Sequence, residues 1–200
     1  MSRKYGFVLF ASSLLAVFVI SFAPTAHAAK PFKLGFSMAL TGPLGPAGKA
    51  ALLAMQIWRD DVNAQGGLLG RKVELVYYDD QTKPANVPGI YAKLIDVDKV
   101  DFAVSGYGTN LIVPALPIVM ERGMVFMGLF GLDANAKFKY NNYFQIMPAG
   151  PEPILDWSRG FFKIAAKQSP KPKTIALLSA DSEFARNAVN GARLNAKAFG

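Results

Sequence analysis

The sequence predicts an α/β fold with a doubly wound parallel sheet. Short apolar runs alternate with segments of helical periodicity, and turns rich in glycine and proline separate them, which gives a βαβαβαβ pattern. Strands that are connected through helices run parallel and are wound with right-handed crossovers. The 200 residues are 52% apolar, which is enough to build an ordinary core.

The first 28 residues have the layout of a secretory signal peptide. Arg3 and Lys4 precede an apolar run over residues 6–22, and a proline and the small-residue site Ala26-His27-Ala28 follow. The alternative is an uncleaved membrane anchor, because the run is almost long enough to span a bilayer. The proline and the A-x-A site favour cleavage after Ala28. We therefore expect an exported, periplasmic protein with no stable membrane insertion after cleavage.

Composition excludes several classes of function. The chain has no cysteine, and its single histidine, His27, leaves with the leader. The mature chain therefore lacks the residues for a Cys/His zinc site, a cysteine nucleophile or a Ser-His-Asp relay. We expect no catalytic residue, no metal and no cofactor. The net charge is +8, but the basic residues are scattered and no dense basic run is interleaved with aromatics, so nucleic acid is not an expected partner.

The first half of the predicted sheet comes from residues 33–97. A buried strand over 33–38 leads through a glycine turn into a helix over 48–64, which Gly66-Gly67 ends. A strand rich in β-branched and aromatic residues spans 71–80, and a weaker helix spans 90–97. The buried stripe of the first helix is predicted to consist of Ala51, Met55, Trp58 and Val62, which recur at helical spacing.

The second half of the sheet comes from residues 100–147. A strand over 100–109 precedes a helix over 111–122, in which Pro114 fits the first turn and Pro117 is expected to cause a kink. Gly123 closes the helix and a fourth strand spans 124–128. A loop and the segment 142–147 complete this part.

The composition changes to proline and glycine near residues 147–153. A helix over 154–167, a strand over 174–179 and a helix over 183–199 follow. One strand cannot form a sheet of its own, so the chain is predicted to be the N-terminal part of a larger protein. We divide it into the signal peptide (1–28), an N-terminal α/β ligand-binding lobe (29–148) and a hinge crossing with the start of an incomplete second lobe (149–200).

Ligands of such sheets bind outside the carboxyl ends of the strands, which singles out three turns. The first, after residue 38, is not a Walker loop. Five residues separate Gly42 from Gly48, Ala50 stands where a hydroxyl is needed, and prolines remove two N–H donors. We interpret it as a tight turn at a helix N-terminus, with Thr41 and Gly42 lining the site.

The second turn, "SGYGTN" (105–110), departs from the dinucleotide pattern because Leu111 occupies the third glycine position. Thr109 either offers its hydroxyl and N–H to a ligand or is only a helix N-cap, and local sequence leaves both open. Tyr107 could form a flat aromatic wall. Asp79 and Asp80, which have no histidine or third carboxylate nearby, are predicted to form a solvated turn rather than a metal or acid–base site.

Several collinear motifs together carry a family resemblance. They are "KLGFSMALTGPLGPAGKA", "VNAQGGLLGRKVELVYYDDQT", "KLIDVDKVDFAVSG" and "PIVMERGMVFM". The chain resembles the periplasmic substrate-binding proteins of branched-chain amino acid-type ABC transporters, with the type I periplasmic binding fold. The resemblance implies two hinged α/β lobes that close around a small ligand and deliver it to a membrane permease. We expect a monomer and no enzymatic activity.

The resemblance also implies site residues. The loop that holds the ligand carboxylate falls on Tyr107, Gly108 and Thr109, and the second binding loop falls on residues 128–133. In that loop Phe130, Gly131 and Leu132 stand where amino acid binders carry a small residue and a threonine. Phe184 matches an aromatic lid of the second lobe. Ala47 stands where another aromatic lid is usual, which would leave extra room for the ligand.

These departures predict an apolar wall on the first lobe. An amino acid would leave its ammonium group without a partner, at a cost of about 1–3 kcal/mol. A hydrophobic or aromatic carboxylate, or an amide, is therefore the expected ligand. Two alternatives to a transport function are a ligand-sensing receptor of the same fold and an exported hydrolase. The hydrolase is disfavoured because no G-x-S-x-G motif is present.

Overall fold

The computed structural model describes residues 29–147 and 149–200, so the predicted signal peptide lies outside the described residues. Pro31–Gly200 forms one compact unit. Its helices and strands, in chain order, are β1 Phe32–Met38, α2 Gly45–Ala64, β2 Val73–Asp79, the 3-10 helix η1 Pro84–Asn86, α3 Val87–Asp96, β3 Phe102–Val104, α4 Thr109–Ile112, the 3-10 helix η2 Val113–Ala115, α5 Leu116–Glu121, β4 Phe126–Gly128, β5 Tyr143–Gln145, α6 Pro153–Ala165 and α7 Glu183–Phe199.

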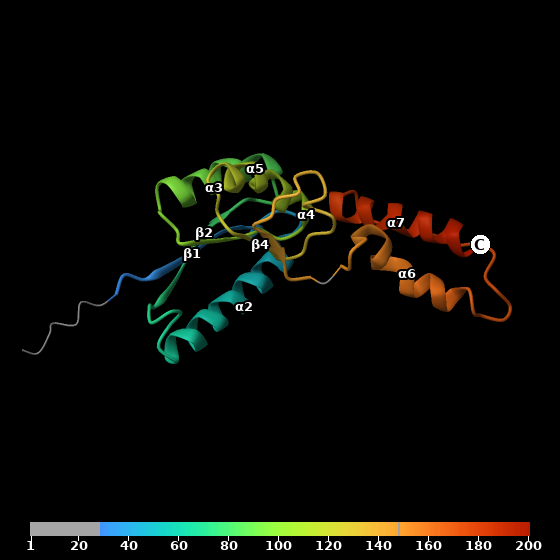
Figure 1. The fold of residues 1–200 in the computed structure, drawn as a ribbon, viewed down its shortest axis with the longest axis horizontal. Coiled ribbons are helices and arrows are strands. Elements are labelled where there is room, and N and C mark those ends of the chain that lie inside the picture. Colours follow the sequence, from blue (N-terminus) through green and yellow to red (C-terminus); the bar gives the residue numbers. More distant parts are fainter. Residues whose placement is uncertain (1–28, 148) are drawn as a thin grey trace, which may run out of the picture. The chain divides into compact units, whose positions relative to one another are not determined.

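The described strands form one five-stranded parallel sheet in the order β2-β1-β3-β4-β5 (Figure 1). The prediction of a doubly wound α/β fold is confirmed. Because β1 lies between β2 and β3, the direction of winding reverses at β1, and the carboxyl ends of β1 and β3 flank a topological switch point. The segment 142–147, to which the sequence analysis assigned no secondary structure, contains the fifth strand, β5 Tyr143–Gln145.

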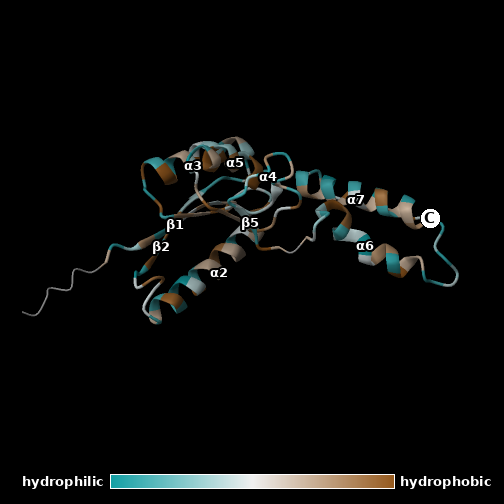
Figure 2. Cartoon of the chain, in the orientation of Figure 1, coloured by the Kyte–Doolittle hydropathy of each residue, from teal (hydrophilic) through white to brown (hydrophobic). Residues whose placement is uncertain are grey.

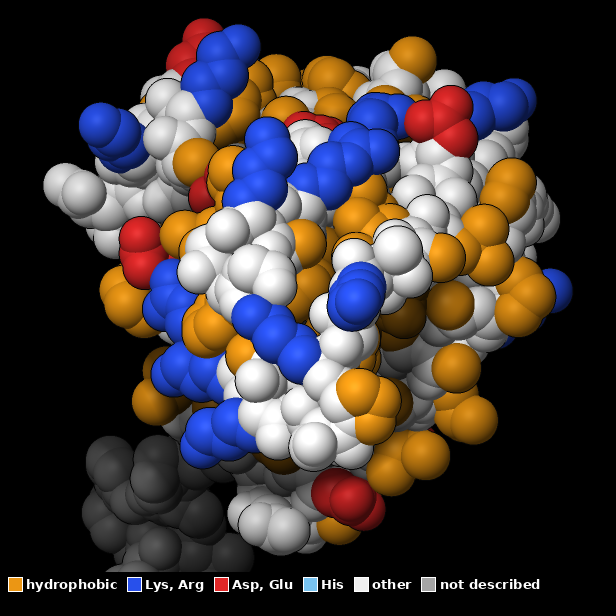
Figure 3. All heavy atoms as spheres, turned by 90° about the vertical axis from the view of Figure 1, so that its right-hand side faces the viewer, with side chains coloured by type: hydrophobic (Ala, Val, Ile, Leu, Met, Phe, Trp, Pro, Cys, Tyr) orange, Lys and Arg blue, Asp and Glu red, His pale blue; other side chains and the backbone are white. Residues whose placement is uncertain are grey.

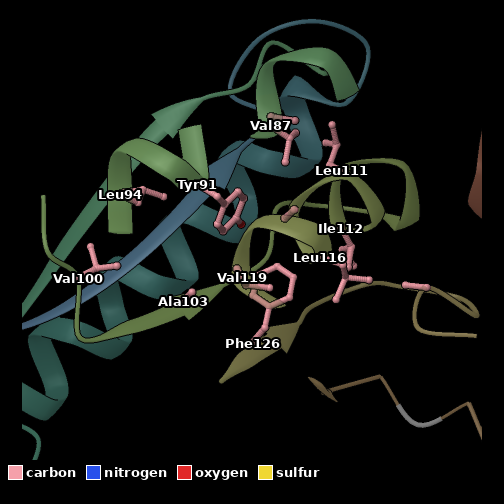
Figure 4. Close-up of a cluster of buried hydrophobic side chains, with 13 residues drawn as sticks. Val87, Tyr91, Leu94, Val100, Ala103, Leu111, Ile112, Leu116, Val119 and Phe126 are labelled. Carbon is pink, nitrogen blue, oxygen red and sulfur yellow. The ribbon is translucent and has the colours of Figure 1, made fainter. Parts of the chain in front are cut away.

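The two faces of the sheet carry separate apolar layers. Figure 1 shows α3 and α5 on one side of the sheet and α2 on the other. The layer under α3, α4 and α5 is the larger one, and Figure 4 shows its side chains converging on Tyr91 and Phe126. The rings of these two residues meet edge to face, with centroids 5.5 Å apart. The layer under α2 includes Phe36, which stacks on Tyr77 at 5.3 Å.

The N-terminal end of α2 packs closely because it begins with buried glycines. A Cβ at Gly48 would lie 1.9 Å from the Ala39 carbonyl oxygen, so only glycine allows this approach. The predicted buried stripe was wrong in part. Ala51 and Met55 pack against the sheet, but Trp58 is 40% exposed, because no element of the described residues covers the C-terminal half of this face.

Prolines break the single helix that was predicted over 111–122. The chain instead forms α4, the 3-10 turn η2 and α5. Pro114 lies in the first positions of η2 and Pro117 in those of α5, where the missing N–H would be unpaired in any case. The segment therefore becomes a series of short turns rather than a kinked helix.

Helices α6 and α7 form an amphipathic pair, and Figure 2 shows hydrophilic and hydrophobic residues alternating along both. Gly191 allows close packing, because a Cβ there would lie 1.8 Å from the Ile154 carbonyl oxygen. The amide of Asn195 donates to the Leu155 carbonyl oxygen (2.8 Å) and to the Ser158 hydroxyl (2.9 Å).

The strand predicted over residues 174–179 is not formed in the structure. A strand requires a hydrogen-bonded neighbour, and the described residues supply no second sheet for this segment to join. Its apolar side chains remain exposed, with Leu178 fully so. Figure 3, which looks at the C-terminal end of the unit, shows basic side chains interspersed with apolar ones. None of the described helices is both long enough and apolar enough to cross a membrane.

Candidate ligand-binding site

The candidate site is built from the segments that follow β1, β2, β3 and β4. Because all these strands are parallel, residues 39–44, 80–83, 105–109 and 129–133 emerge at the same edge of the sheet. They include eight of the ten site residues predicted from the sequence. Ala47 lies in the first turn of α2, and Phe184 lies at the start of α7.

Asp79 ties the first loop to the end of β2. Its carboxylate accepts hydrogen bonds from the Thr41 hydroxyl (2.6 Å) and from the amides of Leu40 (3.0 Å), Thr41 (3.2 Å) and Gln81 (2.8 Å). Partial burial raises the pKa of Asp79, but the hydrogen bonds outweigh it and the pKa lies below its usual value. The exposed Thr41 is thereby positioned at the edge of the sheet.

The turn at Gly42 continues this link. Gly42 has a φ of +78°, and a Cβ there would lie 2.6 Å from the Gln81 carbonyl oxygen. Thr82 donates its hydroxyl to the Thr41 carbonyl oxygen at 2.7 Å. The prediction that Asp79 and Asp80 form a solvated turn was wrong, because Asp80 is fully buried and Asp79 holds the neighbouring loop. Sequence spacing could not reveal the backbone donors that engage them.

Two hydroxyl groups from the turn after β3 hold the loop after β4. Ser105 Oγ accepts a hydrogen bond from the Leu129 amide at 2.9 Å, and Thr109 Oγ1 accepts one from the Leu132 amide at the same distance. Thr109 is fully buried, so in this structure its hydroxyl is engaged by the protein. Leu132 is fully buried as well. The expectation that its side chain forms part of the apolar wall was therefore wrong.

Tyr107 and Phe130 form an aromatic pair at this edge. Their ring centroids are 4.8 Å apart and the rings are tilted by 39°. Phe130 is 43% exposed and Tyr107 is half-buried, so both rings keep surface available. The partly exposed apolar surface at this edge is thus aromatic and comes from Tyr107 and Phe130, whereas the Leu132 side chain is buried.

Next to this pair the backbone turns at Gly108, which has a φ of +97°. Within the part of the chain that the structure describes, the amide N–H groups of Thr109 and Asn110 have no hydrogen-bond acceptor. Free N–H groups of this kind bind the oxygen atoms of anions. The turn can therefore receive a carboxylate through its backbone, although the Thr109 hydroxyl is occupied.

Residues of β5 support the loop after β4. A Cβ at Gly128 would lie 2.1 Å from the Tyr143 hydroxyl oxygen, and one at Gly131 would lie 3.0 Å from Gln145 Oε1. The Tyr143 hydroxyl donates to Gln145 Oε1 at 3.0 Å. Burial raises the pKa of Tyr143 to about 12, so this hydroxyl keeps its proton at neutral pH.

Phe184 packs within the pair formed by α6 and α7. Its ring meets that of Trp157 edge to face, with centroids 5.4 Å apart. Both residues line a hollow of about 310 Å³. Asn187, one turn further along α7, donates to the Leu132 carbonyl oxygen at 3.0 Å. The lid role predicted for Phe184 stays a prediction, as does the extra room predicted at the half-buried Ala47.

Sequence reasoning did not predict the burial of four polar residues near the loops, namely Ser37, Asp80, Tyr91 and Ser105. The Tyr91 hydroxyl donates to the Val104 carbonyl oxygen at 2.6 Å. Burial raises the pKa of Tyr91, so its hydroxyl remains a donor. The available signal was a serine within an otherwise apolar strand and an acidic residue at a strand end.

Comparison with known proteins agrees with this geometry. A family model described as periplasmic binding protein matches residues 31–200. The Leu/Ile/Val-binding protein BraC3 of Rhizobium johnstonii is 30% identical over 108 residues, which cover 54% of this chain and 29% of that protein.

Two solved structures share the fold. A solute-binding protein of an ABC transporter from Rhodopseudomonas palustris, in complex with 3,4-dihydroxybenzoic acid, has a TM-score of 0.71 and 20% identity, and the match covers 85% of this chain and 45% of that one. The branched-chain amino acid transporter substrate-binding protein LivJ from Streptococcus pneumoniae, in complex with isoleucine, has a TM-score of 0.64 and 18% identity over 83% and 47%.

This chain therefore corresponds to about half the length of these structures, and its match covers about 30% of the BraC3 sequence. The family match extends over all the described helices and strands, including the loops of the candidate site. The chain belongs to the periplasmic binding protein family.

Proposed function

We propose that the protein is the substrate-binding component of an ABC importer and that it captures a small carboxylate with a hydrophobic or aromatic body. The observation that carries this proposal is the Tyr107–Phe130 pair beside the free amide groups of Thr109 and Asn110. The amides provide donors for a carboxylate, and the exposed faces of the rings provide a surface for an apolar body.

The same site offers little to the ammonium group of an amino acid. The Thr109 hydroxyl is engaged by Leu132, and the side chain at position 130 is aromatic. Asp79, which lies at the same edge, already accepts four hydrogen bonds from its own loops. Neither the Thr109 hydroxyl nor Asp79 is therefore free to accept from a bound ammonium group, and each missing partner costs about 1–3 kcal/mol.

The fold by itself does not select between ligand classes. Of the two solved structures, one was obtained with a dihydroxybenzoic acid and the other with isoleucine. The choice of an aromatic or hydrophobic acid for this protein rests on its own residues in the two loops. Delivery to a membrane permease, action in the periplasm as a monomer, and closure of a second lobe around the ligand belong to the same proposal. They are supported by the family match and by the sequence of the leader.

The test is a binding screen on the full-length protein with benzoate, 3,4-dihydroxybenzoate, leucine and valine. A ligand at 100 times its dissociation constant stabilises the protein by about 2.7 kcal/mol, which a thermal-shift assay detects. We expect aromatic acids to produce this shift. Tight calorimetric binding of leucine or valine, together with no binding of the aromatic acids, would refute the proposed ligand class.

A variant locates the site. Phe130→Leu keeps an apolar side chain but loses the aromatic face, so affinity for benzoate should fall about 2- to 12-fold, the equivalent of 0.5–1.5 kcal/mol. Phe161→Leu is the matched control, because Phe161 is an exposed aromatic residue on α6 that packs against Phe162. Equal affinities of the two variants would place the ligand elsewhere.

A further inference from the structure

A buried polar cluster lies at the switch point, next to Gly106 at the start of the turn proposed to hold the carboxylate. Ser37 comes from β1, Asp80 follows β2, and Gly106 follows β3. Since β1 separates β2 from β3, the Asp80 side chain reaches past the end of β1 to Gly106. A Cβ at Gly106 would lie 2.8 Å from Ser37 Oγ and 3.2 Å from Asp80 Oδ2. The carboxyl group thus borders the space that a side chain at Gly106 would occupy.

Asp80 has few partners for a carboxylate. It is fully buried, and Oδ1 accepts a hydrogen bond from the Thr82 amide at 2.9 Å. Among the described residues, neither Asp80 Oδ2 nor Ser37 Oγ has a hydrogen-bond partner. A buried carboxyl group with a single donor is costly to ionise.

The groups that face Asp80 do not offset this cost. Burial raises the pKa of Asp80, and the negative charge of Asp79 raises it further. The Thr82 amide and the neighbouring Ser37 hydroxyl lower the pKa, but they do not outweigh burial, so the pKa of Asp80 lies above its usual value. From α3, the Tyr91 hydroxyl approaches the cluster, but it donates to Val104 and accepts from the Ser37 amide at 3.4 Å. No ion pair of the described residues includes Asp80.

We propose that Asp80 is a positioning residue that couples binding of an anionic ligand at residues 107–110 to the uptake of one proton. A ligand carboxylate in the turn places a second negative charge near Asp80, so the complex favours the neutral acid. The proton comes from solvent and resides on the carboxyl group, beside Ser37 Oγ. This inference rests on the proposed function, because it assumes that the ligand is an anion bound at that turn.

The direction in which affinity changes with pH follows from the linkage between ligand binding and proton binding. Since binding takes up a proton, the affinity is highest where Asp80 is already neutral, and it falls as the pH rises through the titration range of Asp80. The maximum slope is about tenfold in the dissociation constant per pH unit, which corresponds to one proton. In Asp80→Asn the amide is neutral at every pH, so this slope disappears.

The experiment measures the affinity of the full-length protein for benzoate between about pH 5 and about pH 8, where benzoate stays ionised. We expect the wild-type affinity to fall with rising pH and the Asp80→Asn affinity to stay nearly constant. Asp96→Asn is the control. Asp96 is ion-paired with Arg122 at 2.6 Å on the outside of α3, and that hydrogen bond lowers its pKa, so this variant should follow the wild type.

A second measurement requires no ligand. A carboxyl group with a raised pKa takes up a proton on folding, so the free energy of unfolding falls as the pH rises from the ordinary carboxyl range through the raised pKa. The wild type should show this fall and Asp80→Asn should lack it. In Ser37→Ala, which keeps the carboxyl group and removes a hydroxyl that lowers its pKa, the fall should move to higher pH. Ser37→Ala also serves if Asp80→Asn does not fold.

The outcomes separate the two proposals. If benzoate binds with an affinity that does not depend on pH in the wild type, the coupling is refuted and the proposed function stands. If none of the aromatic acids binds at any pH, the proposed function fails. Wild type, Asp80→Asn and Ser37→Ala with the same ligand-free pH profile would show that Asp80 is ionised like an ordinary carboxylate, and this would also overturn the coupling.

Discussion

The Thr109 hydroxyl provides the sharpest single test of the site. Sequence left two roles open for it, a ligand contact or a local structural contact, and the structure engages it with the Leu132 amide at 2.9 Å. Both residues are fully buried. Thr109→Val replaces the hydroxyl by a methyl group of similar size, so it removes the acceptor without creating a cavity.

The expected loss of stability in Thr109→Val follows from the buried Leu132 amide, which would be left without an acceptor. An amide N–H without a partner in the interior costs about 1–3 kcal/mol. With a denaturant dependence of about 2 kcal/mol per M of urea, the unfolding midpoint should fall by about 0.5–1.5 M. Thr109→Ser retains the hydroxyl and is the matched control, with a midpoint near that of the wild type.

Equilibrium urea unfolding, followed by circular dichroism, measures this difference, and benzoate titration of the same proteins supplies the second readout. The reasoning fails if Thr109→Val unfolds at the wild-type midpoint but binds benzoate more than about tenfold more weakly, the equivalent of 1.4 kcal/mol. That result would mean that the hydroxyl contacts the ligand and that its bond to Leu132 contributes little.

The remaining predictions concern the framework that supports the loops. Gly48→Ala should lower the free energy of unfolding by about 1–3 kcal/mol or more, because the new Cβ would meet a backbone carbonyl oxygen at 1.9 Å. Gly89→Ala is its control: this helical glycine has open space around it, so alanine should stabilise α3 by about 0.5–1 kcal/mol, and thermal unfolding distinguishes the two signs. Tyr91→Phe should cost about 1–3 kcal/mol in urea unfolding because a buried carbonyl loses its donor, and an unchanged midpoint would contradict that bond. Asp79→Asn should flatten the acid limb of the stability profile: a carboxylate with a lowered pKa contributes stability above the ordinary carboxyl range and loses it as the pH falls through the lowered pKa. An acid limb identical to that of the wild type would argue against this role of Asp79.

The sequence predicted the features that depend on local pattern. Strand and helix periodicity placed β1, α2, β2 and α7 within a few residues, and α7 matched its predicted span of 183–199. The family resemblance rested on collinear motifs over the mature chain and is confirmed by the match over residues 31–200.

Other features depend on neighbours that local pattern does not specify. Residues 174–179 have the composition of a strand but form none, since no described strand lies beside them. Trp58 has the spacing of a core residue but is exposed, because the described chain covers only part of the face above α2.

The character of the site was decided by tertiary structure. The sequence by itself determined the α/β winding and the loops that meet at the carboxyl edge of the sheet. The strand order then brought Asp80, Ser37 and Gly106 together across β1, and it placed the Thr109 hydroxyl beneath Leu132. Hydrogen-bond partners and burial depend on residues distant in sequence, so an acidic pair that was predicted to be solvated proved to contain a buried carboxyl group next to the turn after β3.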